Sequence, residues 1–168
     1  MNRSKMIEKF GEIGEQFAAD YFRSMDCNVI MSPDKYDMHK DMTVDGKTVE
    51  VKTENPFYIK RAITISKEAS NQLKKCLNVD RLIFVIVPLK KDEIFSKHIL
   101  QDDLWRWDGI EIREAPPVGE RKYFYSNTST GKRVCFPIED SKLLKCITDE
   151  KTLKLFQKYS TSNFGKFK

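Results

Sequence analysis

The order of apolar and polar residues predicts a chain of mixed α and β structure that begins with a helix. Residues 4–24 lack proline, and apolar residues recur there at helical spacing, which is typical of an amphipathic helix with one buried face. Ser4 is positioned to cap the first turn. The face expected to be buried consists of Ile7, Phe10, Gly14, Phe17, Ala18 and Tyr21.

An alternating pattern in residues 41–52 predicts a β-hairpin. Asp45 and Gly46 form one of the dipeptides most typical of a two-residue hairpin turn. Successive side chains of a strand point to opposite faces, so the pattern separates an apolar face from a polar one. The apolar face consists of Met42, Val44, Val49 and Val51, and the polar face of Asp41, Thr43, Thr48, Glu50 and Lys52.

The remaining pattern predicts two more helices and several strands. Residues 68–77 have helical character and lead into residues 82–87, whose continuous β-branched and apolar run is typical of a strand buried on both faces. Residues 88–121 are rich in proline and glycine and are expected to be irregular, whereas residues 141–158 are expected to form a closing helix. Short strands are expected at residues 64–66, 123–125 and 133–136, the last two as a second hairpin.

Composition indicates a globular chain of about one domain. The 168 residues are 40% hydrophobic, which is enough to bury a core. The net charge of +5 is compatible with a nucleic-acid partner. The four cysteines lack zinc-finger spacing and are expected to be reduced thiols in the cytoplasm. No apolar run approaches the length of a membrane span, so no membrane partner is expected.

The polar face of the predicted hairpin carries the most informative chemistry. Asp41 and Glu50 are expected to face each other across the strands, where opposed Cβ atoms lie roughly 4.5–5.5 Å apart. Two carboxylates placed in this way repel unless a cation lies between them, and a hard divalent cation prefers such oxygen ligands. An acid-x-lysine triplet occurs five times in the chain, but only Glu50-x-Lys52 follows an acid across a tight turn. The alternative is an ordinary hairpin with a solvated charged face.

Asp41, Glu50 and Lys52 resemble the motif of the PD-(D/E)xK nuclease superfamily, which includes many restriction endonucleases, RecB-type nucleases and Holliday-junction resolvases. The chain departs from the motif at Lys40, where the family name has proline. The resemblance implies an α/β fold with a restriction-endonuclease-like core, in which helices flank a central mixed sheet. A single domain spanning residues 1–168 is expected, with a catalytic core in residues 1–90 and a variable part in residues 91–168.

The same resemblance implies a DNA nuclease that depends on Mg²⁺ or Mn²⁺. Asp41, Glu50 and the backbone carbonyl of Val51 would ligate the ion. Glu15, from the first helix, would complete the set of ligands directly or through water. Lys52 would orient the attacking water or stabilise the charged transition state.

Further residues are candidates by resemblance or by chemistry. Asp37 is the alternative first acid, in a longer hairpin. Gln72 corresponds to a helix glutamine that touches the site in RecB-type nucleases. Lys60 and Arg61 would meet phosphates, and Trp105 would stack on a base. Each of these residues also has an ordinary structural explanation. Gln72 would then be a solvent-facing helix residue, Lys60 and Arg61 would lie in a solvated turn, and Trp105 would belong to a small secondary core.

The sequence alone leaves several functions open. The enzyme would be a general DNase or a structure-selective Holliday-junction or flap resolvase, and a homodimer is left open because resolvases place two symmetrical cuts. So small a chain suits a phage, mobile-element or host-DNA-degrading nuclease in the cytoplasm of a bacterial cell. Two classes of protein without enzymatic activity also remain. One is a nucleic-acid-binding module on the same fold, and the other is an interaction protein in which the motif occurs by chance.

Overall fold

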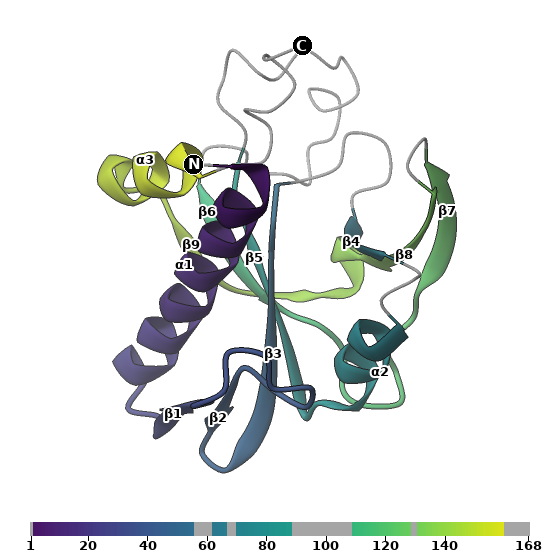
Figure 1. Ribbon diagram of the computed structural model, residues 1–168. Coiled ribbons are helices and arrows are strands. Elements are labelled where there is room, and N and C mark those ends of the chain that lie inside the picture. The colour runs from purple at the N-terminus through teal and green to yellow at the C-terminus, as the bar shows by residue number, and fades with distance from the viewer. Residues whose placement is uncertain (1, 56–61, 67–69, 89–108, 129–130, 160–168) are drawn as a thin grey trace.

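The computed structural model describes residues 2–55, 62–66, 70–88, 109–128 and 131–159, and its elements are drawn in Figure 1. Three α-helices and nine strands occur in this part of the chain. In chain order they are α1 (Arg3–Ser24), β1 (Val29–Met31), β2 (Met42–Val44), β3 (Lys47–Glu54), β4 (Ala62–Ser66), α2 (Ser70–Asn78), β5 (Arg81–Ile86), β6 (Ile110–Glu114), β7 (Phe124–Thr128), β8 (Gly131–Pro137), β9 (Lys142–Ile147) and α3 (Glu150–Lys158), with a short 3₁₀ helix at Ile138–Asp140.

Six strands form a mixed central sheet in the order β1-β2-β3-β5-β6-β9. β3 and β5 are parallel, and α2 lies between them in the chain, whereas every other pair of neighbours is antiparallel. A second, antiparallel sheet has the order β4-β8-β7. The expected mixed α/β architecture with a mixed central sheet is therefore confirmed.

Helix α1 covers one face of the central sheet (Figure 1). Its buried residues Phe10, Ala18 and Phe22 belong to one core cluster with Val49 and Val51 of β3. Phe156 of α3 joins the same cluster and makes an edge-to-face contact with the ring of Phe10, at 6.0 Å between centroids. This side of the molecule holds the apolar face that the hairpin pattern predicted.

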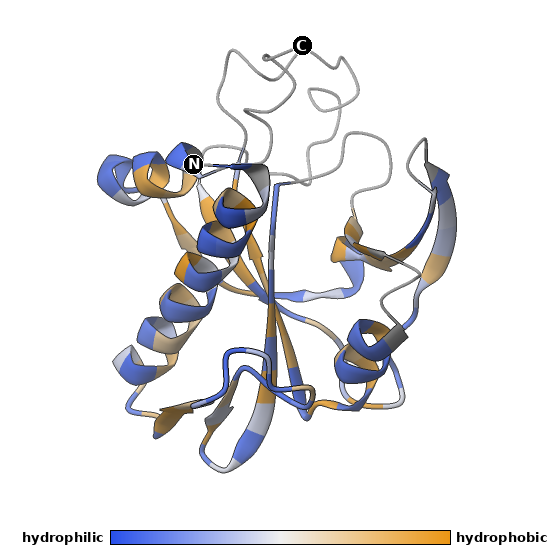
Figure 2. Ribbon diagram, viewed as in Figure 1, coloured by the Kyte–Doolittle hydropathy of each residue, from blue (hydrophilic) through white to orange (hydrophobic). Residues whose placement is uncertain are grey.

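The opposite face of the sheet is covered by α2 and the second sheet. Leu82, Phe84 and Ile86 of β5 form a second core cluster with Cys76 of α2 and Phe136 of β8. The alternate residues of β5 point into the first cluster, so this strand is buried on both faces, as its apolar run predicted. Figure 2 shows β5 as a mostly hydrophobic strand, whereas hydrophobic and polar residues alternate in β3.

A glycine allows α1 to approach β3 closely. A Cβ atom added at Gly14 would lie 1.7 Å from Oγ1 of Thr53. Such a distance is far inside van der Waals contact, so only glycine fits between the helix and the strand here. This contact fixes the height of α1 above β3.

The predicted hairpin and helix are confirmed, with small differences. The register pairs Met42 with Val49 across the turn, as predicted. The helix cap is Asn2 rather than Ser4, because the Asn2 side chain accepts a hydrogen bond from the amide of Lys5 at 3.0 Å. Ile7 is 45% exposed and does not belong to the buried face.

Two predictions about the second half of the chain were wrong. The irregular segment at residues 88–121 contains β6, in which Ile110 and Ile112 are buried against β5 and β9. The single helix expected at residues 141–158 is instead β9 followed by α3. The break lies at Asp149, whose carboxylate accepts a hydrogen bond from the amide of Thr152 at 2.9 Å and so begins a new helix.

None of the described helices has both the length and the apolar character needed to cross a lipid bilayer.

Candidate active site

The first candidate acid, Asp41, immediately precedes β2. The paired ladder stops at Met42 and Val49, so Asp41 lies just beyond it and not in a ladder pair with Glu50. Oδ2 of Asp41 accepts a hydrogen bond from the amide nitrogen of Val51 at 2.7 Å, in place of a strand partner. The N–H and C=O of one strand residue face the same edge, so the carbonyl of Val51 also faces this acid.

The second candidate acid is buried beneath α2. Glu50 alternates with Val49 and Val51 and points to the opposite face of β3, where its side chain is 1% exposed. Burial raises the pKa of Glu50 to about 7, and the charge of Asp41 adds to this shift while Lys52 opposes it. Its Oε2 atom is buried without a well-directed hydrogen bond among the described residues, although a lysine nitrogen lies close to it.

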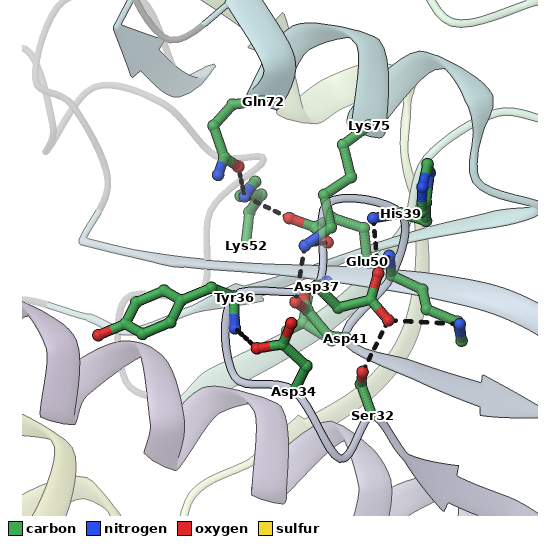
Figure 3. A network of polar contacts seen from close by, with 12 residues as sticks. Ser32, Asp34, Tyr36, Asp37, His39, Asp41, Glu50, Lys52, Gln72 and Lys75 are labelled. Carbon is green, nitrogen blue, oxygen red and sulfur yellow. Dashed lines mark hydrogen bonds and ion pairs between the residues drawn. The ribbon is translucent and has the colours of Figure 1, made fainter.

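That nitrogen belongs to Lys75 of α2, which the sequence analysis did not identify. Nζ of Lys75 lies 2.7 Å from Oε2 of Glu50 and 3.1 Å from Oδ1 of Asp41. Figure 3 shows the side chain reaching from the helix to both carboxylates. Burial alone would lower the pKa of Lys75, but Glu50 and Asp41 raise it above its ordinary value, which keeps the group an ammonium.

The candidate catalytic lysine is held in place from two sides. Nζ of Lys52 donates a hydrogen bond to Oε1 of Glu50 and another to Oε1 of Gln72, the latter at 2.6 Å. Burial alone would lower the pKa of Lys52, whereas the neighbouring carboxylate of Glu50 raises it above its ordinary value. Gln72 is thus placed beside the candidate site, where the resemblance expected it.

Helix α2 is fixed at its C-terminal end, and this positions its two site residues. The carboxylate of Asp80 accepts hydrogen bonds from the amide and the hydroxyl of Thr48, at 2.8 and 3.1 Å. The guanidinium of Arg121 donates to the carbonyls of Cys76 and Val79 at 2.8 and 2.7 Å. These bonds satisfy one carbonyl in the last turn of the helix and one just after it, and they tie the residues that follow the helix to the start of β3.

Glu15 reaches the same cleft from α1. Burial raises the pKa of Glu15 to about 7, and the charges of Asp41 and Glu50 add to the shift. A carboxyl group with this pKa exchanges a proton near neutral pH, which suits a group that holds or activates water. Glu15 lines the same cleft as Asp41 and Glu50.

Asp37, the alternative first acid, is bonded within the loop that precedes β2. Its carboxylate accepts hydrogen bonds from the amide of His39 and the hydroxyl of Ser32, both at 2.8 Å, and pairs with Lys40 at 3.3 Å. The hydrogen bonds from His39 and Ser32 hold the pKa of Asp37 well below its usual range. Asp37 lines the cleft, but its oxygens organise the loop before β2 (Figure 3).

Together these residues line a cleft of about 330 Å³. The candidate residues Lys60, Arg61 and Trp105 lie outside the described residues. The lining residues are Glu15, Lys35, Tyr36, Asp37, Met38, Asp41, Glu50, Val51, Lys52, Asn71, Gln72 and Lys75.

The donor atoms of the cleft fit a hard divalent cation in part. In the described ranges, no three side chains of His, Cys, Asp or Glu converge closely enough to hold a metal ion without other ligands. Two carboxylates nevertheless face one buried position, and the Val51 carbonyl faces the same strand edge. Mg²⁺ commonly takes one or two protein carboxylates and keeps several waters, so the chemistry of these donors is compatible with it.

Comparison with protein-family models and with curated proteins assigns this chain to no family. No protein-family model matches it, and no curated protein has significant similarity to it. Function must therefore be inferred from the chemistry of the cleft.

Proposed function

We propose that this protein is a metal-dependent DNA nuclease with a restriction-endonuclease-like core and a PD-(D/E)xK type of active site. One observation carries the proposal. The carboxylates of Asp41 and Glu50 both contact one cationic group, the ammonium of Lys75, and the ammonium of Lys52 contacts Glu50 as well. A metal ion held by the two carboxylates, with a lysine beside it, would suit phosphodiester hydrolysis, because negative charge builds on the phosphate as water attacks.

Each side chain has a role in this proposal. Asp41, Glu50 and the carbonyl of Val51 would hold Mg²⁺ or Mn²⁺. When bound, such an ion lowers the pKa of water and offsets charge on the scissile phosphate. Lys52, oriented by Gln72, would stabilise the charge that develops on the phosphate oxygens. Glu15 would hold a water on the opposite wall of the cleft.

DNA is the proposed substrate, and hydrolysis would leave a 5′-phosphate and a 3′-hydroxyl, by analogy with the family. The net charge of +5 supports a polyanionic partner. Both a general DNase and a structure-selective junction or flap resolvase are consistent with the cleft. A homodimer would be needed by a resolvase that cuts two strands symmetrically.

A non-catalytic nucleic-acid-binding module is the second candidate, and Lys75 favours it. The ammonium of Lys75 neutralises Asp41 and Glu50 at the position that a metal ion would take. In a protein without catalytic activity, such an internal ion pair would make the two acids structural. The two candidates can be told apart, because only the nuclease would bind a divalent ion at these oxygens and cleave DNA.

The test uses plasmid, linear duplex, single-stranded and four-way-junction DNA, each with Mg²⁺, Mn²⁺ or EDTA. The nuclease proposal expects cleavage of at least one substrate with metal and none with EDTA. The preferred substrate would separate a general DNase from a resolvase. Binding of DNA without cleavage in any metal would support the non-catalytic module instead.

A further inference from the structure

Lys75 occupies the position between the two candidate metal-binding carboxylates. Its side chain is 8% exposed, and those of Asp41 and Glu50 are 11% and 1% exposed. Two buried carboxylates next to each other cannot both be ionised without a nearby cation. Within the described part of the chain, Lys75 is the residue whose ammonium contacts both of them.

The four carboxylate oxygens are divided among different partners. Oδ2 of Asp41 accepts from the Val51 amide, and Oε1 of Glu50 accepts from Lys52. Oδ1 of Asp41 and Oε2 of Glu50 are the atoms that Lys75 contacts. These two oxygens are therefore the ones open to an exchange of cations.

We propose that Lys75 is a built-in counter-cation, which holds Asp41 and Glu50 together in the metal-free protein and is displaced when a divalent ion binds. This inference rests on the proposed function, because it requires a metal ion at the same oxygens. Mg²⁺ bonds its oxygen ligands at about 2.0–2.1 Å. An ammonium 2.7 and 3.1 Å from the same two oxygens would then overlap with the ion and repel it.

Displacement requires movement of the side chain and not of the helix. Thr48 and Arg121 hold the C-terminal end of α2, so the backbone of Lys75 stays in place. Lysine has a flexible four-carbon stem and a compact charge, which lets the ammonium swing away while its backbone is fixed. Lys52 stays bonded to Gln72 and Oε1 of Glu50, so the two lysines have separate roles.

The counter-cation lowers the affinity for metal, because part of the binding free energy is used to displace it. Replacing Lys75 by methionine keeps the length of the side chain and removes the charge. We expect Lys75→Met to bind Mn²⁺ at least about tenfold more tightly than wild type, because no ammonium has to be displaced. A factor of ten in affinity corresponds to about 1.4 kcal/mol. Lys74→Met is the matched control, because Lys74 is the exposed neighbour on the same helix.

The experiment measures Mn²⁺ binding to the full chain by titration calorimetry or electron paramagnetic resonance. Tighter binding by Lys75→Met, with wild-type affinity in Lys74→Met, supports the inference. If wild type and both variants bind Mn²⁺ equally, the counter-cation role is rejected while the metal site of the proposed function stands. If none of the three binds Mn²⁺, both proposals are rejected.

A thermal-unfolding measurement covers the case in which Lys75→Met folds poorly without metal. Removing the ammonium takes away the cation that contacts Oδ1 of Asp41 and Oε2 of Glu50, so the metal-free variant should unfold at a lower temperature than wild type. Mn²⁺ should then raise the unfolding temperature of Lys75→Met and of Lys75→Gln more than that of wild type. An equal rise in all three proteins would overturn the inference.

Discussion

Oδ2 of Asp41 accepts a hydrogen bond from the amide of Val51 at 2.7 Å, so this acid has a structural task besides any role at a metal. The two tasks are separable by mutation. Asp41→Asn keeps an oxygen that can accept the bond but removes the charge, and we expect it to fold without binding Mn²⁺ or cleaving DNA.

Asp41→Ala should lose both tasks. An amide left without its partner costs about 1–3 kcal/mol, so this variant should unfold more readily than Asp41→Asn by that amount. Urea unfolding and Mn²⁺ titration of both variants check the prediction. Equal stability of the two variants would show that the bond to Val51 contributes little, and cleavage by Asp41→Asn would remove Asp41 from the metal site.

Gln72 is expected to act on cleavage through Lys52. Its Oε1 atom accepts from Nζ of Lys52 at 2.6 Å, and a hydrogen bond to a charged group contributes about 1.5–3 kcal/mol. Gln72→Ala should therefore slow cleavage by about tenfold or more and leave Mn²⁺ affinity unchanged. Asn78→Ala, at an exposed position of the same helix outside the cleft, is the control. A variant Gln72→Ala that cleaves DNA as fast as Asn78→Ala would show that Lys52 does not need this partner.

Two glycines of α1 should respond in opposite directions to alanine. Gly14→Ala places a Cβ against Oγ1 of Thr53, and overpacking of this kind costs about 1–3 kcal/mol. Gly11→Ala has open space around the new Cβ and should stabilise the protein by about 0.5–1 kcal/mol, because alanine favours a helix. Chemical unfolding of the two variants tests this pair, and destabilisation by both would contradict the helix-to-strand packing described above.

The stability of the metal-free protein should fall as the pH rises through neutrality. Glu54 accepts hydrogen bonds from the amide and the hydroxyl of Thr64, both at 2.8 Å, and burial raises its pKa from 4.5 to about 8. The folded protein therefore binds this proton more tightly than the unfolded chain, so the free energy of unfolding decreases between about pH 4.5 and about pH 8.

Glu54→Gln should remove the part of this decrease that lies nearest pH 8. Glu50 and Glu15 have pKa values raised only to about 7, so above that pH the change in stability comes from Glu54. Unfolding free energies measured at several pH values check this, with Glu139→Gln at an exposed position as the control. An unchanged slope between about pH 7 and about pH 8 in Glu54→Gln would contradict the prediction.

The parts of the site that depend on local pattern could be predicted from the sequence. The Asp45-Gly46 turn sets the register of the hairpin, and the register sets which face carries Glu50 and Lys52. The position of Lys75 depends on how α2 packs over β3, which no local pattern records. One signal was available, because Lys75 follows Gln72 by three residues and so shares its helix face.

Three strands, β1, β6 and β9, were not predicted from the sequence, and the last two have a related explanation. In β6, the alternation of Ile110 and Ile112 with charged residues is short and lies next to prolines, so the composition of the surrounding segment hid it. In β9, Leu143, Leu144 and Ile147 have spacings that a helix and a strand both allow. Hydrogen bonding to β6 favours the strand. Because this pairing joins residues far apart in the sequence, the local pattern does not predict it.

The most direct test of the central claim is DNA cleavage by wild type, Lys52→Ala and Lys47→Ala, each with Mn²⁺ and with EDTA. Lys47 is an exposed lysine on the same strand and serves as the matched control. The proposed mechanism predicts cleavage by wild type and Lys47→Ala with Mn²⁺ alone, and a loss of about 100-fold or more in Lys52→Ala. Equal cleavage by all three proteins, or cleavage that persists in EDTA, would contradict the assignment of this site.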